Sequence, residues 1–214
     1  MPRTMVIHKE VFKLEELDQS QQQRAHEHWR EHALDHDWWE FVYADFESVC
    51  GLLGVQLDTS SVRLMGGGSR GKSKIYFSGF ASQGDGACFE GSYSYTKGSV
   101  AAIMAERPDD VELNRIAVAL FKTQRPFFFK LAATIKHRGH YYHSGCTSID
   151  VQHSEDTYRP IRSAEDDIAD ELRSLMDWLY RQLEKEHDYQ ISFEQFKESC
   201  ESNDYEFTEY GRLV

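Results

Sequence analysis

The sequence lacks the marks of several protein classes. Among its 214 residues there is no CxxC pair, and the four cysteines are widely scattered, at positions Cys50, Cys88, Cys146 and Cys200. This usage is typical of a reduced cytosolic protein and not of a disulfide scaffold. No apolar run approaches the roughly 18 residues that a membrane helix requires. The first ten residues also lack the apolar core of a secretory signal, so we expect a soluble cytoplasmic protein.

Linkers and repeats are also missing. No internal repeat occurs, and no proline- or serine-rich stretch marks a domain boundary. Hydrophobic residues make up 40% of the chain and aromatic residues 13%, which favours a packed globule over a disordered tail. The sequence therefore predicts a single domain over residues 1–214.

Acidic residues dominate the charge but are unevenly placed. The net charge is −12, and residues 163–214 hold 15 acids against 5 bases. The segments expected to form strands are basic instead. Acidic helix faces are often simply solvated, but they also suit a basic protein partner or mimicry of nucleic acid. Direct nucleic-acid binding by these helices is not expected, because phosphate contacts require lysine and arginine.

Residues 74–95 are the most informative segment. Two aromatic-rich runs, 74–81 and 87–95, flank a loop with the turn-forming residues Gly84, Asp85 and Gly86. Glycine and aspartate tolerate the positive φ of tight strand reversals, so this pattern predicts a β-hairpin. A second hairpin is predicted from strands at 130–137 and 142–152.

Helices are predicted on both sides of these hairpins. Asp18 with Gln21 forms a capping signature before a helix that reaches about Leu34. The clearest helix starts at Ser163 and carries an apolar stripe at helical spacing. A second helix is predicted after the capping pair Asp37 and Glu40, and it ends at Gly54, which suits a left-handed C-cap. Further helices are predicted at 99–108, 110–124 and 193–200, and further strands at 6–14, 55–58, 62–65 and 206–213. These elements predict an α+β fold, with a mainly antiparallel sheet built from two β-hairpins and covered by amphipathic helices.

The segment Gly66–Ser73 matches the phosphate-loop pattern GxxxxGK[ST]. That loop needs a strand before it and a helix after it. Here it runs directly into Ile75 and Tyr76, which favour a strand. We interpret the segment as a flexible basic loop between two strands.

Two histidines and two cysteines offer a candidate site. His140, His143 and Cys146 have spacings compatible with metal ligation, and Cys88 could approach from the other hairpin. Cys88 beside a histidine could instead be a thiol nucleophile. The alternative is a decorated hairpin surface with buried, inert cysteines, and we expect no metal site and no catalytic residue set.

Other histidines and tryptophans admit similar alternatives. His28, His32 and His36 would share one helical face if the first helix persists, although a solvated edge explains them better. Trp38 and Trp39 could anchor a partner or belong to the core.

Several segments of the chain resemble a family. They are DWWEFVYADF at 37–46, the hairpin at 74–95, GHYYHSGCTSIDV at 139–151, the helix at 165–189 and YEFTEYGR at 205–212. Together they resemble bacteriophage and proteobacterial proteins labelled "antitoxin of toxin–antitoxin stability system". The resemblance implies a mobile-element protein that counters a toxin or a bacterial defence system in the host cytoplasm.

Combining these observations, we expect a cytoplasmic antitoxin-like inhibitor that binds a protein partner and needs no cofactor. The predicted contact residues are acidic or aromatic: Asp166, Asp167, Asp170, Glu171, Asp177, Trp38 and Trp39. The alternative is a small-ligand site on the basic hairpins, for a nucleotide signal or for hydrolysis. Its candidate residues are Lys74, Asp85, Cys88, Lys136, Arg138, His140, Tyr141 and His143.

Overall fold

The structure, a computed structural model, describes residues 10–154 and 162–214. These residues form two compact units. Of the described residues, 41–154 and 162–184 make up the larger unit, and 10–40 and 185–214 make up the smaller one. The α+β class is confirmed, whereas the single domain stays a prediction.

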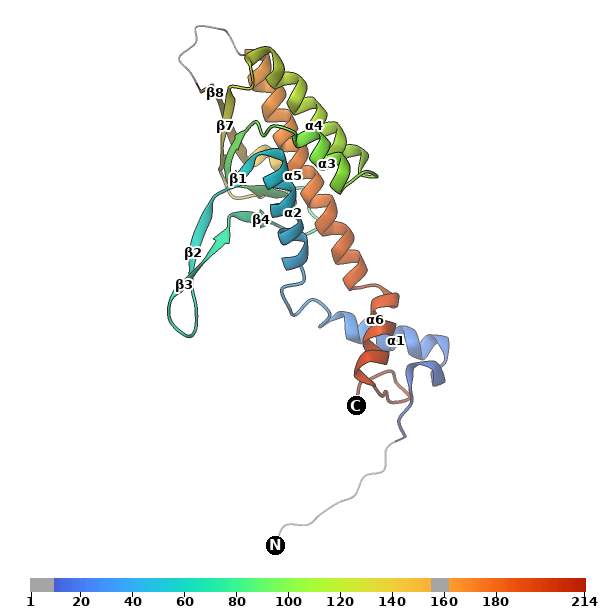
Figure 1. Ribbon diagram of the computed structural model, residues 1–214. Helices are drawn as coiled ribbons and strands as arrows, with labels where there is room; N and C mark the ends of the chain where they lie inside the picture. The colour runs from blue at the N-terminus through green and yellow to red at the C-terminus, as the bar shows by residue number, and fades with distance from the viewer. Residues whose placement is uncertain (1–9, 155–161) are drawn as a thin grey trace. The chain divides into compact units, whose positions relative to one another are not determined.

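The larger unit contains a four-stranded antiparallel sheet in the order β1-β6-β7-β8 (Figure 1). Its strands are β1 (Val55–Leu57), β6 (Gly91–Ser94), β7 (Leu131–His137) and β8 (Thr147–His153). Strands β7 and β8 confirm the second predicted hairpin, although β8 begins five residues later than expected. Two further antiparallel pairs lie between β1 and β6 in the sequence: β2 (Thr59–Arg63) with β3 (Ser69–Ser73), and β4 (Ile75–Phe77) with β5 (Ala87–Phe89).

Three backbone hydrogen bonds join these strand pairs at one junction. The Asp58 amide donates to the Glu90 carbonyl at 2.9 Å, and the Lys74 amide donates to the Asp58 carbonyl at 2.8 Å. The Glu90 amide closes the ring by donating to the Lys74 carbonyl at 3.0 Å. Each of the three residues links two strands along the chain, so the junction satisfies backbone groups that the separate ladders leave unpaired.

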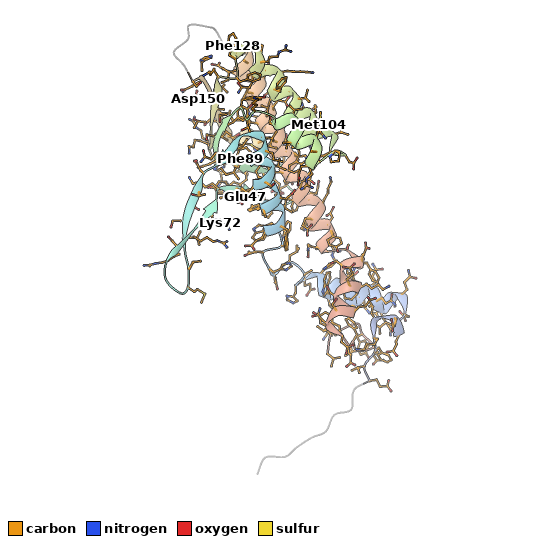
Figure 2. The ribbon with its side chains drawn as sticks, in the orientation of Figure 1. Glu47, Lys72, Phe89, Met104, Phe128 and Asp150 are labelled. Atoms are coloured by element: carbon orange, nitrogen blue, oxygen red, sulfur yellow. The ribbon has the colours of Figure 1, made fainter. Side chains whose placement is uncertain are left out.

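Helices cover the sheet in the larger unit (Figure 1). The apolar stripe predicted on the longest helix is confirmed, because Ile168, Leu172 and Leu179 are fully buried. Phe89 of β5 is also fully buried and lies in this core (Figure 2). The helices are α2 (Glu40–Leu53), α3 (Ser99–Glu106), α4 (Val111–Gln124) and α5 (Arg162–Gln190). Gly54 ends α2 at φ 88°, as its predicted capping role requires.

In the smaller unit, α1 (Gln19–Arg30) packs against α6 (Phe193–Asn203). The C-terminal residues of α5, 185–190, also belong to this unit. The predicted capping box is confirmed: Asp18 accepts from the Gln21 amide at 2.8 Å, and Gln21 accepts from the Asp18 amide at 2.7 Å. A short 3₁₀ helix, η1 (Leu14–Glu16), precedes α1. A small apolar cluster holds these segments together: Leu17, Ala25, Phe196, Cys200 and Phe207.

Some predicted elements differ from the structure. Residues 6–9 of the first predicted strand lie outside the described residues, and within 10–14 the pairing is one bridge from Phe12 to Phe207. The predicted terminal strand at 206–213 is likewise reduced to bridges at Phe207 and Leu213. Helix α1 ends at Arg30 instead of Leu34. Over the described ranges, the helices are all too short or too polar to span a bilayer.

Candidate functional site

The exposed face of α5 carries a row of carboxylates. Asp166, Asp170 and Asp177 are spaced so that they share one side of the helix, opposite the buried leucine stripe. All three side chains are exposed, as is Asp167 one position along the helix. Within the described ranges, Asp166, Asp167 and Asp177 form no ion pair, and Asp170 pairs with Arg173 at 3.1 Å. The row therefore presents negative charge to solvent.

Glu171 differs from its neighbours on this helix. Its side chain is only 16% exposed, and Glu171 Oε1 lies 2.7 Å from Arg115 Nη1 on α4. The carboxylate of Glu171 is therefore engaged within the protein, and its contact with a partner stays a prediction.

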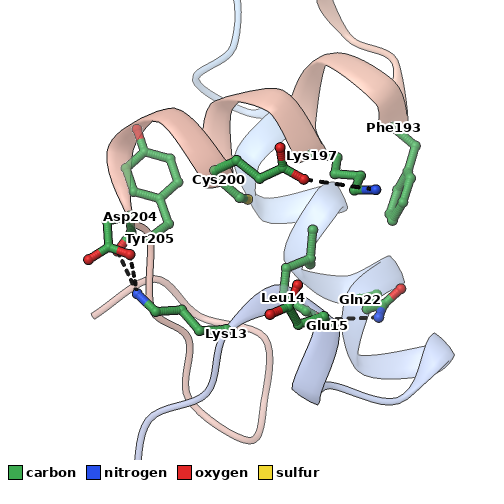
Figure 3. Close-up of a pocket in the computed structure, with 10 residues that line it drawn as sticks. Lys13, Leu14, Glu15, Gln22, Phe193, Lys197, Cys200, Asp204 and Tyr205 are labelled. Carbon is green, nitrogen blue, oxygen red and sulfur yellow. Dashed lines mark hydrogen bonds and ion pairs between the residues drawn. The ribbon is translucent and has the colours of Figure 1, made fainter.

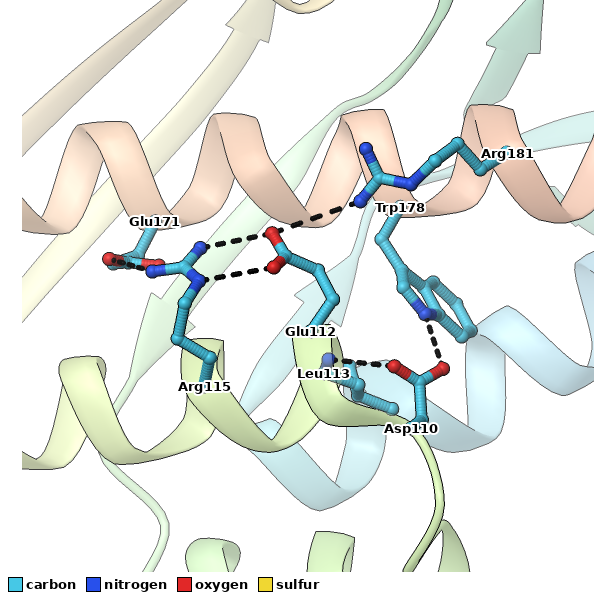
Figure 4. A network of polar contacts seen from close by, with 7 residues as sticks. All are labelled: Asp110, Glu112, Leu113, Arg115, Glu171, Trp178 and Arg181. Atoms are coloured by element: carbon cyan, nitrogen blue, oxygen red, sulfur yellow. Dashed lines mark hydrogen bonds and ion pairs between the residues drawn. The ribbon is translucent and has the colours of Figure 1, made fainter.

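A polar network holds α4 against α5 (Figure 4). Arg115 also donates to Glu112 through Nε and Nη2, each at 3.2 Å, and this hydrogen bonding lowers the pKa of Glu112. Asp110 caps α4 by accepting from the Leu113 amide at 2.9 Å. Its other oxygen accepts from Trp178 Nε1 at 2.7 Å. These contacts fix the orientation of α5 and hence of its exposed face.

The two adjacent tryptophans of the smaller unit do not form an exposed anchor. Trp38 is only 6% exposed and Trp39 is half-buried, with their rings edge to face at a centroid distance of 5.6 Å. Trp38 also contacts the His187 ring at 5.7 Å. This burial agrees with the core alternative for Trp38, and a role of the two tryptophans in partner binding stays a prediction.

The two hairpins of the alternative site do lie together. A side chain on Gly84 would come within 2.6 Å of the Tyr141 ring, and one on Gly86 would come within 2.4 Å of His143 Cα. The loop from β7 to β8 therefore packs directly on the turn from β4 to β5. A Cβ at Gly86 would meet the backbone of that loop, so glycine is required there, whereas a Cβ at Gly84 would meet only the side chain of Tyr141.

This packing brings Cys88, His143 and Cys146 into one neighbourhood. Cys146 Sγ lies 3.3 Å from His143 Nε2. Burial, with a contribution from nearby Cys146, raises the pKa of Cys88 to about 12. His140 remains exposed. Among residues 10–154 and 162–214, no group of three His, Cys, Asp or Glu side chains is arranged to hold a metal ion.

The basic residues of the alternative site are largely neutralised. Lys74 Nζ lies 2.8 Å from Glu90 Oε2. Lys136 pairs with Asp58 and lies 3.9 Å from the same Glu90 oxygen. The Asp85 carboxylate accepts from the backbone of its own turn, which lowers its pKa. Arg138, the third cation expected to hold an anion, is exposed and lies outside the ion pairs of Lys74 and Lys136.

Thiol labelling distinguishes the inert cysteines from an accessible one. We expect iodoacetamide at pH 7.5 to modify Cys146 in the folded protein while Cys88 and Cys50 stay unmodified. Their raised pKa values keep both thiols protonated, and the protonated thiol is not the nucleophile. Peptide mass spectrometry before and after denaturation measures this difference. Rapid labelling of native Cys88 would contradict its burial and revive the nucleophile hypothesis.

The segment Gly66–Ser73 forms a turn and strand β3, followed by strand β4 instead of a helix. As expected, a helix does not follow the segment, but the predicted loop is wrong for residues 69–73, which pair with β2 as strand β3. The helical face proposed for His28, His32 and His36 does not form, because α1 ends at Arg30.

Two pockets lie in the smaller unit. The one in Figure 3, of about 470 Å³, is lined by apolar and charged side chains, and four of the charged ones pair with one another. Lys13 lies 2.7 Å from Asp204, and Lys197 lies 3.8 Å from Glu201. The second pocket, of about 590 Å³, is lined by residues of α1 and of the C-terminal segment after α6.

Sequence reasoning missed the residues that organise both surfaces. Arg115, Asp58 and Glu90 appear in the sequence as ordinary surface charges, and each has an ion-pair partner at least 16 positions away along the chain.

Comparison with known proteins gives one match. Residues 38–192 match the family described as a domain of unknown function (DUF8835). No curated protein matches the chain. No solved structure matches it either. The matched residues include all of the larger unit, whereas the residues that line the two pockets all lie outside them. Because the match spans well over half of the sequence, this chain belongs to the DUF8835 family.

Proposed function

We propose that this protein is an antitoxin-like or counter-defence protein that binds and neutralises a macromolecular partner. The partner would be a toxin or a defence nuclease complex with a basic surface. The observation that carries the proposal is the exposed carboxylate row of α5, formed by Asp166, Asp170 and Asp177. The setting in a phage or mobile element rests on the sequence resemblance described above.

The location of the row supports binding over catalysis. It belongs to the segment that matches the family, whereas the residues around both pockets do not. The helix that carries it is anchored by Arg115 and Trp178, so the charges are held in place before a partner arrives. Preorganised, complementary charges accelerate association and select the partner.

Charge reversal tests the proposal. The tagged full-length protein is used to capture its partner from a bacterial host that carries toxin and defence loci, and native mass spectrometry gives the stoichiometry. We expect Asp166→Lys/Asp170→Lys/Asp177→Lys to slow association with that partner by roughly 10- to 100-fold. The salt dependence of the association rate should become flatter, because long-range attraction is lost.

A matched variant controls for net charge. Glu47→Lys/Glu106→Lys/Asp109→Lys changes the charge by the same amount at exposed positions outside α5. This control should retain most of the association rate. Unchanged binding by the α5 variant, or an equal loss in the control, would rule out the acidic face as the contact surface.

A further inference from the structure

The β2–β3 ribbon has no role in the core. All residues of β2 are exposed, and in β3 Ser69 to Lys72 are exposed while Ser73 is half-buried. Neither face of this pair is covered, and it reaches away from the four-stranded sheet of the larger unit (Figure 1). An isolated two-stranded hairpin is marginally stable by itself. Packing therefore does not explain why the chain devotes residues 59–73 to it.

The ribbon is positively charged in an acidic protein. Residues 59–73 contain Arg63, Arg70 and Lys72 and no acid, while the whole chain carries −12. None of these three cations forms an ion pair with any residue in the described part of the chain. At the base of the ribbon, Lys74 and Lys136 are neutralised by Glu90 and Asp58. The first cation beyond this base that forms no ion pair within the described residues is therefore Lys72, which is labelled in Figure 2.

The strand register arranges the cations. Lys72 lies opposite Ser60 and Arg70 opposite Val62, so both cations project from one face of the ribbon. Alternate residues on a strand are roughly 7 Å apart, which separates these two charges along it. The opposite face holds small residues apart from Arg63 near the tip.

The tip is apolar and fully accessible. Met65 has a relative exposure of 109% and Leu64 of 48%. Gly67 and Gly68 adopt φ of 86° and 90°, which permits the tight reversal next to them. Two adjacent apolar side chains are therefore available for contact at the end of the basic arm.

We propose that the β2–β3 ribbon is a binding arm for duplex DNA. A two-stranded ribbon fits the major groove, which is about 12 Å wide. Arg63, Arg70 and Lys72 would contact phosphates, and Met65 would reach the apolar thymine methyl groups in the groove. Residues 59–73 contain no aromatic side chain on which unpaired bases could stack, which disfavours single strands. The deep, narrow major groove of duplex RNA does not admit the ribbon.

This inference goes beyond the proposed function and does not depend on the acidic face of α5. It also departs from the expectation that the protein makes no direct contact with nucleic acid. That expectation was argued from the acidic helices, and the ribbon is the segment where the local charge has the opposite sign.

Fluorescence anisotropy with the full-length protein and a labelled 20-base-pair DNA tests the proposal. Three phosphate contacts predict an affinity that falls roughly 40-fold between 50 and 200 mM salt. Arg63→Ala/Arg70→Ala/Lys72→Ala should abolish measurable binding at 50 mM salt. Lys97→Ala/Lys122→Ala/Arg125→Ala removes the same charge from exposed positions elsewhere in the larger unit and should bind like the wild type. Met65→Ser should weaken binding without changing the salt dependence.

A shortened protein separates the arm from the fold. Thr59 and Ser73 are register partners, so an Asn-Gly turn can replace residues 60–72. This variant should lose DNA binding while its melting temperature shifts by less than about 3 °C. The absence of duplex binding by the wild type at 50 mM salt would overturn the proposal. The partner of the ribbon would then be an acidic protein surface. Tighter binding to single-stranded DNA or duplex RNA would overturn the groove assignment.

Discussion

Gly91→Ala should destabilise the protein by about 3 kcal/mol or more. Gly91 lies opposite Leu57 where β6 pairs with β1. A Cβ at this position would come within 2.2 Å of the Gln56 carbonyl oxygen. That oxygen belongs to the backbone, so it cannot rotate away, and the two strands would have to separate. Urea denaturation followed by circular dichroism measures the loss.

The substitution of alanine for Gly51 should have the opposite effect on folding stability. Gly51 lies inside α2, and a Cβ there would meet no atom within 4 Å. Alanine should therefore stabilise the protein by about 0.5–1 kcal/mol through its higher helix propensity. A Gly91→Ala protein as stable as the wild type would contradict the close approach of β1 to β6.

Trp178→Ala should cost about 3–5 kcal/mol of folding stability. Its ring is buried, 2% exposed, and stacks with Phe46 at a centroid distance of 6.3 Å. Its Nε1 also donates to Asp110, the cap of α4. The substitution removes both contacts and leaves a cavity between α2, α4 and α5.

Trp178→Phe separates the two contributions. Phenylalanine keeps most of the ring packing but cannot donate to Asp110, so we expect a loss of roughly 1.5–3 kcal/mol. Thermal and urea unfolding of the three proteins give the comparison. A negligible effect of Trp178→Ala would show that α5 is not anchored at this position, which would also weaken the argument for a fixed acidic face.

Local signals predicted much of the fold. The Asp18 cap, the glycine after α2 and the leucine stripe of α5 act within one or two helical turns, and all are confirmed. The hairpin of β4 and β5 follows from its glycine-rich turn in the same way. The terminal segments were harder, because the bridge from Phe12 to Phe207 depends on residues at opposite ends of the chain.

The candidate sites could be predicted less well. Exposure of Asp166 and Asp177 follows from helical spacing, but the pairing of Glu171 with Arg115 requires α4 to lie beside α5. Likewise, nothing in the sequence places the loop after β7 on the turn after β4. That contact depends on the absence of side chains at Gly84 and Gly86, which can be recognised once the two hairpins are seen together.

The order of strand pairing has a consequence for how the chain folds. The β1–β6 pair encloses residues 58–90, and within them the β2–β3 and β4–β5 hairpins are nested side by side. Both hairpins join neighbours in sequence, so each can form without waiting for distant contacts. Every such closure shortens the free chain between β1 and β6. The entropy cost of pairing β1 with β6 therefore falls each time one of the inner hairpins forms.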